Sequence, residues 1–264
     1  MPGALTNAFA DLAEGYEKRR VWWALAREDI GDQHRRTTLG PFWLLFNYMT
    51  FAGTFIFVFR SSSSGSDHYP TYVAVGLLVW LYIMETITQA MTVFVREKSF
   101  IKGTRLPLTV YVMRLAMQSV IRTLYALAGC VIILLLAGDS IHVGWLLALP
   151  GVLLLLLATP GAILVFGFLG AYVPDSQFFV ANIMRIGMFL TPVFWRLETA
   201  GGGVRSLFYH WNPFTYFLEI VRQPMLNQSM PLLALGICAI ITVVLWLIGL
   251  LLLGTLRRKL VFVL

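Results

Sequence analysis

Hydrophobic residues run along this chain in long uncharged blocks instead of the alternating pattern of membrane barrel strands. The first block, 37–59, follows the basic pair Arg35 and Arg36 and contains no Asp, Glu, Lys or Arg. Its 23 residues rise about 35 Å as a helix, enough to cross a hydrocarbon core of about 30 Å. Hydropathy and helix breakers together predict six spans, at about 39–59, 70–94, 108–136, 145–172, 178–195 and 231–254.

Composition supports the same fold class. Hydrophobic residues make up 58% of the chain and charged residues only 12%, and the mean hydropathy is +0.77. These values lie outside the range of ordinary soluble domains. The sequence therefore predicts an all-α integral membrane protein, with residues 37–264 forming a single six-helix transmembrane domain and residues 1–36 preceding it as a separate region.

The distribution of Lys and Arg predicts how the chain is oriented. Six cations precede the first span, four lie between the second and third spans, and three follow the sixth. The opposite side holds only Arg60, Arg196, Arg205 and Arg222. The positive-inside rule then places both termini in the cytoplasm. Because topology accounts for the net charge of +7, we expect no nucleic-acid partner.

The sequence lacks the motifs of an enzyme. It contains no GxxxxGK[ST] loop, so the chain cannot bind ATP through a P-loop, and it has no GxSxG or HExxH sequence. Cys130 and Cys238 fall inside predicted spans, and neither cysteines nor histidines have metal-ligand spacing. We therefore expect no catalytic residues, no metal site and no cofactor in this chain.

Two predicted cytoplasmic segments combine charge with hydrophobic residues. Within 1–36, apolar residues recur near helical spacing, which is typical of an amphipathic helix at the membrane interface. This helix either anchors the chain or also docks a cytoplasmic partner. The segment 96–107 is either a solvated loop or a short helix that inserts Phe100 and Ile101 into a partner.

Two predicted spans carry polar side chains at helical spacing, so that each set shares one face. The sets are Tyr82, Glu85 and Gln89 in the second span and Arg114, Gln118 and Arg122 in the third. Charges inside a membrane are costly and usually face other helices or a wet cavity. Glu85 therefore either pairs with Arg114 or Arg122 to hold the two helices in register, or these residues line a polar pathway.

The segment between the fifth and sixth spans is rich in aromatic residues, unlike an ordinary exposed loop. Gly201–Gly203 separates it from the fifth span, and Asn212-Pro213 divides it. These breaks predict two short helices in a re-entrant hairpin at about 199–230. Irregular backbone at membrane depth needs protein or water around it, so we expect the hairpin to cap the exit of a pathway.

Several blocks resemble the membrane subunits of type-2 ABC exporters for O-antigen and capsular polysaccharides. The resemblance covers nearly the whole chain in the same order. It rests on Asp29-Ile30, on 35–43 (RRTTLGPFW), on 191–195 (TPVFW), on 212–214 (NPF) and on 219–226 (EIVRQPML).

The resemblance implies a homodimeric permease in the bacterial inner membrane that works with two copies of a separate ATP-binding subunit. ATP and Mg²⁺ would bind that partner, and the substrate would be a polyprenyl-pyrophosphate-linked glycan exported from cytoplasm to periplasm. An ABC permease for a drug or simple lipid is the alternative. A membrane protein that needs no ATPase is a third possibility, of a different class.

The resemblance also implies roles for particular residues. Arg35 and Arg36 would attract the pyrophosphate at the cytoplasmic mouth, as expected for cations at a membrane surface. The elements that couple to the ATPase would include Arg27, Asp29, Lys98, Phe100, Ile101 and Lys102. The periplasmic gate would include Trp195, Trp211, Asn212, Pro213, Phe214, Arg222 and Pro224.

Overall fold

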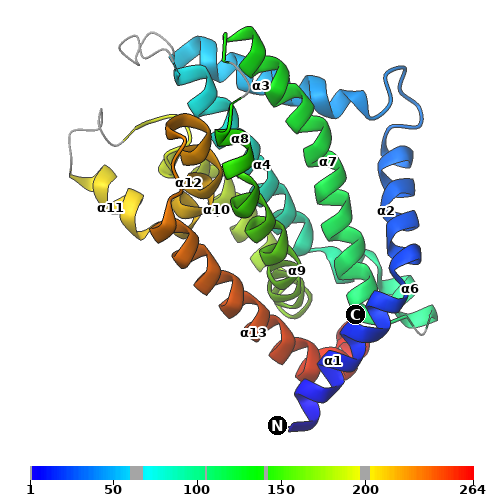
Figure 1. Ribbon diagram of the computed structural model, residues 1–264. Helices are drawn as coiled ribbons and strands as arrows, with labels where there is room; N and C mark the ends of the chain where they lie inside the picture. The colour runs from blue at the N-terminus through cyan, green and yellow to red at the C-terminus, as the bar shows by residue number, and fades with distance from the viewer. Residues whose placement is uncertain (1, 60–67, 105, 140–141, 197–202) are drawn as a thin grey trace.

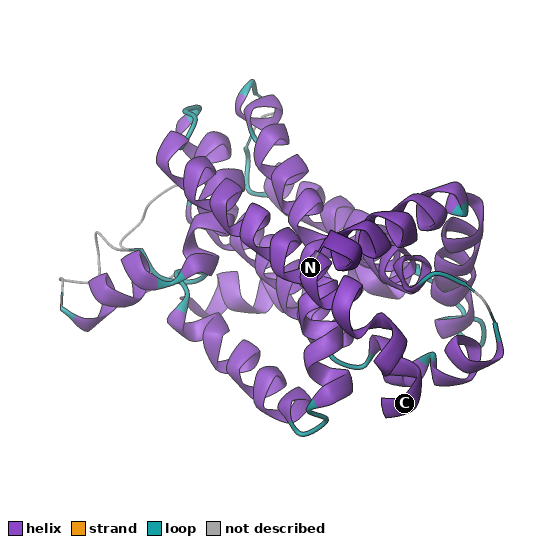
Figure 2. Ribbon diagram, turned by 90° about the horizontal axis from the view of Figure 1, so that it is seen from below, coloured by secondary structure: helices purple, strands orange, loops and turns teal. Residues whose placement is uncertain are grey.

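The described part of the molecule is built from helices joined by short connections. The computed structural model describes residues 2–59, 68–104, 106–139, 142–196 and 203–264, and no strand occurs within these ranges (Figures 1 and 2). This confirms the all-helical class. The first four residues of the predicted hairpin, 199–202, lie outside the described ranges.

Five helical segments are long and apolar enough to cross a membrane. They are α3 (Phe42–Phe59), α4 (Tyr69–Ala90), α7 (Leu108–Leu136), the pair α8 (Gly144–Leu147) and α9 (Leu149–Tyr172), and α13 (Leu232–Val263). They match five of the six predicted spans. At its C-terminal end α13 continues nine residues beyond the predicted boundary of 254.

The fifth predicted span, 178–195, is shorter than expected. Its helix, α10 (Ser176–Leu190), has 15 residues and so rises only about 22 Å. The helix ends before Pro192 because a proline disfavours helical backbone in the residue that precedes it. Thr191 accordingly has extended backbone, with φ −79° and ψ 143°. The structure therefore shows five helices of spanning length rather than six within its described residues.

Helix α4 forms the centre of the bundle. In the apolar window of α4, 72% of residues are buried, against 11% in α3. It contacts α3, α7, α9, α10 and α12 (Pro213–Asn227). Because α4 is surrounded by its own chain, the exposed apolar surface belongs to outer helices such as α3 and α10, where Phe57 and Phe178 are largely uncovered.

Close helix packing depends on two glycines of α9. A Cβ atom on Gly170 would overlap the backbone carbonyl of Met91, next to the end of α4. A Cβ on Gly151 would overlap the carbonyl of Ile220 in α12. Only a residue without a side chain permits these approaches, so both contacts with α9 depend on glycine.

The region before the first span forms two helices, α1 (Pro2–Glu17) and α2 (Arg19–Gln33). Helix α1 crosses the end of the bundle near the C-terminus and contacts α7 and α13 (Figure 1). Helix α2 packs along α7 and buries Trp22, Ala26 and Ile30. Both helices are therefore joined to the transmembrane bundle by packing as well as by the chain.

Short helices occupy the other two segments of interest. Helices α5 (Val93–Arg96) and α6 (Lys98–Gly103) connect α4 to α7. Helices α11 (Val204–Trp211) and α12 form the described part of the 199–230 segment, with the break at Asn212 as expected. In Figure 1 this helix pair lies away from the end that carries both termini.

Candidate functional site

Four side chains from three segments meet near the start of α7. We call them the charged cluster: Asp29 of α2, Glu97 between α5 and α6, and Arg114 and Gln118 of α7. The Arg114 guanidinium donates to both oxygens of Asp29, from Nε at 2.6 Å and from Nη2 at 2.7 Å. Its third nitrogen, Nη1, donates to Oε2 of Glu97 at 2.9 Å. Gln118 Nε2 also donates to Asp29.

The cluster is well shielded. The side chain of Arg114 is 14% exposed, that of Glu97 8% and that of Asp29 25%. Arginine suits this position because its planar fork can hold two carboxylates at once, whereas lysine provides only a point charge. Arg114 therefore ties α2 and the α5–α6 segment to the same turn of α7, as the shared face of Arg114 and Gln118 allows.

A second ion pair lies about two turns further along α7. Arg122 Nη1 is 3.0 Å from Oε1 of Glu85 in α4, and Gln89 Nε2 donates to the same oxygen at 3.0 Å. Of the two partners considered for Glu85, the structure selects Arg122. Tyr82, which was predicted to share a polar face with Glu85 and Gln89, instead contacts α9: its hydroxyl lies 2.5 Å from the Thr159 hydroxyl.

Sequence analysis did not single out Asp11, yet it is fully buried. Oδ1 of Asp11 in α1 accepts hydrogen bonds from the Thr109 amide at 2.9 Å and the Thr109 hydroxyl at 2.6 Å. Its other oxygen accepts from the Leu108 amide at 3.3 Å and pairs with Arg257 Nε of α13 at 2.9 Å. Asp11 thus satisfies free amides at the N-terminus of α7, although it lies about a hundred residues earlier in the chain.

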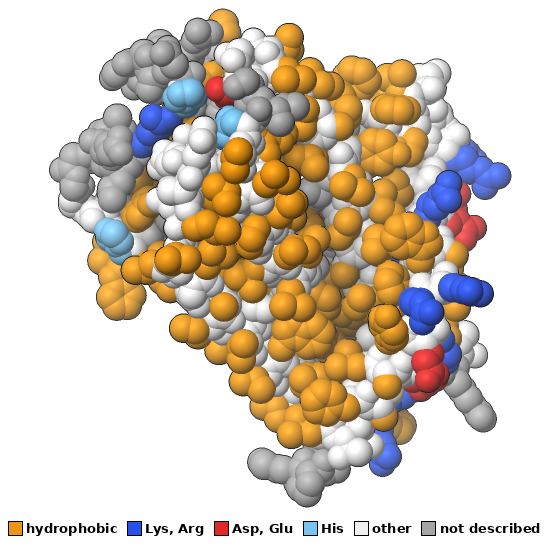
Figure 3. Space-filling model, in the orientation of Figure 1, with side chains coloured by type: hydrophobic (Ala, Val, Ile, Leu, Met, Phe, Trp, Pro, Cys, Tyr) orange, Lys and Arg blue, Asp and Glu red, His pale blue; other side chains and the backbone are white. Residues whose placement is uncertain are grey.

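Four of the predicted coupling residues lie on the surface. Arg27, Lys98 and Lys102 are exposed, and Phe100 is 58% exposed. Ile101, in contrast, is buried within the bundle. Lys and Arg side chains gather on the side of the molecule formed by α2, next to a broad hydrophobic surface (Figure 3). Phe100 is thus available to a partner, whereas Ile101 holds α6 in place.

The basic pair at the predicted cytoplasmic mouth also lies on the surface. Arg35 and Arg36 are exposed in the turns between α2 and α3. Arg35 Nη1 is 3.9 Å from Asp32 Oδ1, and both side chains are more than half exposed. Surface pairs of this kind contribute little, so the Arg35 charge can act on a ligand.

The predicted gate residues hold α11 and α12 against the rest of the chain. Asn212 caps α12, because its Oδ1 accepts from the Phe214 amide at 3.0 Å, and its Nδ2 donates to the Thr191 hydroxyl at 2.7 Å. Phe214 meets Trp80 of α4 edge to face at 5.5 Å. Trp195 donates to the carbonyl of Phe189.

The remaining gate residues differ in exposure. Pro213 occupies the first turn of α12, where a proline needs no amide partner. Pro224 is buried inside the same helix. Trp211 is 79% exposed at the end of α11, so its side chain is accessible to lipid or to another chain.

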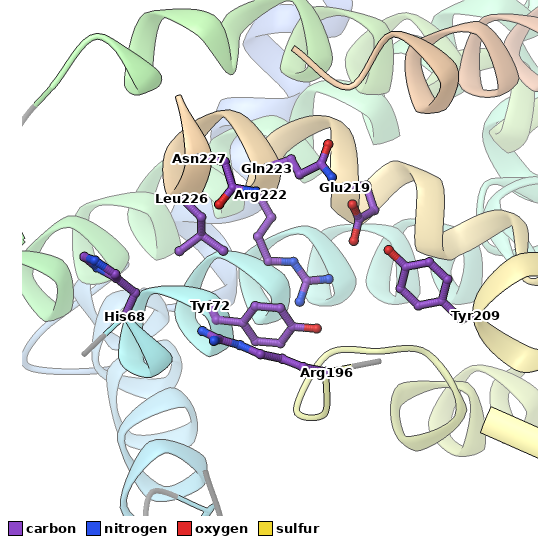
Figure 4. A pocket seen from close by; sticks show the side chains of 9 residues that line it. All are labelled: His68, Tyr72, Arg196, Tyr209, Glu219, Arg222, Gln223, Leu226 and Asn227. Carbon is purple, nitrogen blue, oxygen red and sulfur yellow. The ribbon is translucent and has the colours of Figure 1, made fainter. Parts of the chain in front are cut away.

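A polar cavity of about 240 Å³ lies beside α12. Its wall includes Tyr72 of α4, Arg196 after α10, Tyr209 of α11, and Glu219 and Arg222 of α12 (Figure 4). The Arg222 and Arg196 guanidinium carbons lie 3.9 and 4.8 Å from the centre of the Tyr72 ring. Arg222, which is 1% exposed, also donates from Nη1 to the Pro192 carbonyl at 2.8 Å.

Tyr209 and Glu219 form the other side of this cavity. Burial raises the pKa of Tyr209 above its ordinary value of about 10, and the negative charge of the Glu219 carboxylate raises it further. The phenol therefore stays protonated at neutral pH. Sequence analysis missed Tyr72, Tyr209 and Glu219 as a group, because aromatic residues are common throughout this chain and their meeting depends on tertiary structure.

Fold and site together define a multi-pass membrane protein whose buried charges connect helices. The chain belongs to the ABC-2 type transporter family, whose family model matches residues 20–226. It is therefore a membrane permease, since subunits of this family are the transport components of their systems.

Curated relatives have related names. An O-antigen export system permease protein RfbA of Myxococcus xanthus is 22% identical over 244 residues, which is 89% of this chain and 92% of that protein. A protein of the same name from Klebsiella pneumoniae is 21% identical over 171 residues, or 64% of this chain. That alignment spans 66% of the Klebsiella protein, just under two thirds of its length.

Proposed function

We propose that this chain is the transmembrane subunit of an ATP-driven exporter that moves a polyprenyl-pyrophosphate-linked polysaccharide, of the O-antigen or capsule type, from cytoplasm to periplasm. Two copies would assemble in the bacterial inner membrane with two ATP-binding subunits, with both termini in the cytoplasm. Family membership and the names of the relatives support the substrate class. The observation that carries the mechanism is the charged cluster.

The cluster offers a physical route for force. In the proposed mechanism, closure of the ATP-binding subunits pushes on the exposed residues of α2 and the α5–α6 segment. Arg114 holds a carboxylate from each of these segments, so a displacement of either one acts on α7. Helix α7 in turn is joined to α4 by the Arg122–Glu85 pair.

The dimer seam and the conduit remain parts of this proposal. We place spans one and five, α3 and α10, at the seam, because much of their apolar surface is exposed in one chain. The second span, α4, is buried within its own subunit and would respond from behind them. Helices α11 and α12 would close the periplasmic exit and move when α4 and the turn after α10 shift.

A pair of neighbouring substitutions tests the coupling role. Asp29→Asn removes the carboxylate charge held by Arg114, whereas Glu28→Gln removes an exposed carboxylate one residue away. We expect Asp29→Asn to leave assembly with the ATP-binding subunit intact but to reduce glycan export about tenfold. Glu28→Gln should export normally. Surface glycan is measured by immunoblot of cells in which the variant replaces the native gene. Equal export by both variants would remove the cluster from the mechanism.

The entry role of the basic pair has its own test. Replacing Arg35 and Arg36 together with glutamine should reduce export by several-fold, because the pyrophosphate loses its attraction at the cytoplasmic mouth. Assembly should be unaffected, since both side chains are exposed. Co-purification of the ATP-binding subunit provides the assembly control. Unchanged export would rule out this role.

The alternative substrates are distinguished by deleting the gene. An exporter of lipid-linked glycan predicts that glycan accumulates inside the cell and disappears from its surface. A permease for a drug or simple lipid predicts normal surface glycan. Purification of the chain without any P-loop companion, under conditions that preserve other complexes, would instead favour a membrane protein that needs no ATPase.

A further inference from the structure

The polar cavity beside α12 has the charge and donors of an anion site. Two guanidinium groups, Arg196 and Arg222, lie on its wall, and Glu219 is the single carboxylate among the described lining residues. The Tyr209 hydroxyl points toward that carboxylate (Figure 4). His68, also on the wall, has its Nδ1 3.2 Å from Asp139 Oδ1. Among the described lining residues, arginine side chains therefore outnumber carboxylates.

Arg222 has donors to spare. Its Nη1 is used by the Pro192 carbonyl, but within the described ranges neither Nε nor Nη2 has a hydrogen-bond partner, although both are buried. Buried polar groups are normally satisfied, and an unmade bond to a charged group is costly. The guanidinium is held against the Tyr72 ring, so its position is fixed before a ligand arrives. The arrangement suits a ligand that brings several acceptor oxygens.

We propose that this cavity binds a phosphate-type oxyanion, with Arg222 and Arg196 as its ligands. The cavity, at about 240 Å³, holds far more than a single water molecule. Two sources share this chemistry: the diphosphate of a lipid carrier and the phosphodiester headgroup of a membrane phospholipid. The first source rests on the proposed function, whereas the site itself does not depend on it.

Binding is measured on the full chain in a maltoside detergent, which contains no phosphate. The probe is inorganic pyrophosphate, titrated by calorimetry at constant ionic strength. The starting protein carries Arg35→Gln and Arg36→Gln, so that the basic pair near α3 cannot contribute. We expect this protein to bind pyrophosphate. Adding Arg222→Gln should weaken binding by about tenfold or more, because one charge-assisted donor group is lost.

Two further variants keep the test decisive if Arg222→Gln fails to fold. Arg196 is only partly buried, and Arg196→Gln should weaken binding by several-fold. Glu219→Gln should strengthen it by several-fold, because repulsion of the anion is removed. A purely structural role for Arg222 predicts no such gain. Arg20→Gln, an exposed arginine on α2, is the matched control and should leave pyrophosphate binding unchanged.

The source of the anion is then decided by two soluble probes. Tighter binding of geranyl diphosphate assigns the site to the carrier, and tighter binding of dihexanoyl phosphatidylglycerol assigns it to a phospholipid headgroup. No binding by the starting protein, or no difference between the cavity variants and Arg20→Gln, would overturn the proposal. Export is not part of this readout, so such a failure would leave the exporter function standing. Loss of that function would equally leave a measured anion site intact.

Discussion

At the scale of single residues, the molecule uses arginine where several acceptors must be held together. Arg114 binds two carboxylates and Arg257 binds a carboxylate that also caps a helix. Each carboxylate comes from a segment outside the long helices. In a low-dielectric surrounding such groups persist only as pairs, so these arginines fix where the flanking segments sit on the bundle.

Arg114→Gln tests this at the residue scale. The change leaves Asp29 and Glu97 close together and without their shared cation, so we expect a loss of about 3 kcal/mol in the free energy of unfolding. We choose the lower end of the usual range because Asp29 is 25% exposed. Arg35→Gln, at the surface, should cost less than about 0.5 kcal/mol. Denaturant titration in detergent measures both, and equal midpoints would show that the cluster adds no stability.

At the scale of elements, composition predicts the spans because all of them lie in the same hydrocarbon environment. A helix of about 20 uncharged residues satisfies its own backbone in hydrocarbon, whatever packs against it. This is why α3, α4, α7, α8–α9 and α13 were found at their predicted places. Helix α10 is shorter than the predicted span because Pro192 ends the helix within an apolar block, and hydropathy does not detect this local effect.

Partners could not be predicted in the same way. Spacing placed Arg114 and Gln118 on one face of α7, which the structure confirms through their shared acceptor Asp29. That acceptor lies 85 residues away in the chain, and Glu85, which pairs with Arg122 instead, was equally available by composition. The choice depends on how α2 and α4 pack against α7. The position of Tyr72 could not be predicted for the same reason. Its two arginine neighbours are Arg196, which follows α10, and Arg222, which lies in α12.

Helix packing yields a second prediction. Gly170→Ala places a methyl group against the Met91 backbone, which cannot move as a side chain could, so we expect a loss of more than about 2 kcal/mol. Gly236→Ala in α13 has no atom within 4 Å of the new methyl and should be neutral or slightly stabilising. The thermal midpoints of the two purified variants decide this. A midpoint for Gly170→Ala at or above that of Gly236→Ala would show that α9 does not need this close approach.

At the scale of the whole molecule, charge is divided between two ends with different surroundings. Both termini lie with α1 and α6 at one end of the molecule, whereas α11 and α12 lie apart from that end (Figure 1). The positive-inside rule orients the first region toward the cytoplasm. The two regions should therefore be reachable from opposite sides of the membrane.

Cysteine labelling tests this orientation directly. Both native cysteines are buried and free, so a chain with Cys130→Ala and Cys238→Ala provides a background without reactive thiols. Lys98→Cys and Asn227→Cys then report exposed positions on α6 and at the end of α12. A membrane-impermeant maleimide should label Asn227→Cys in intact spheroplasts and Lys98→Cys only after lysis. The reverse pattern would invert the topology and place the termini outside the cytoplasm.

The capping of α7 by Asp11 has a consequence for biosynthesis. Arg257, the cation that pairs with Asp11, is synthesised 246 residues after it. At about 5–20 residues per second, the acid waits roughly 10 to 50 seconds for that partner. Helix α1 can therefore dock fully only after α13 has been inserted. A chain released before Arg257 is made would keep an uncompensated carboxylate in α1, so synthesis of α13 and correct assembly of this end of the molecule are linked.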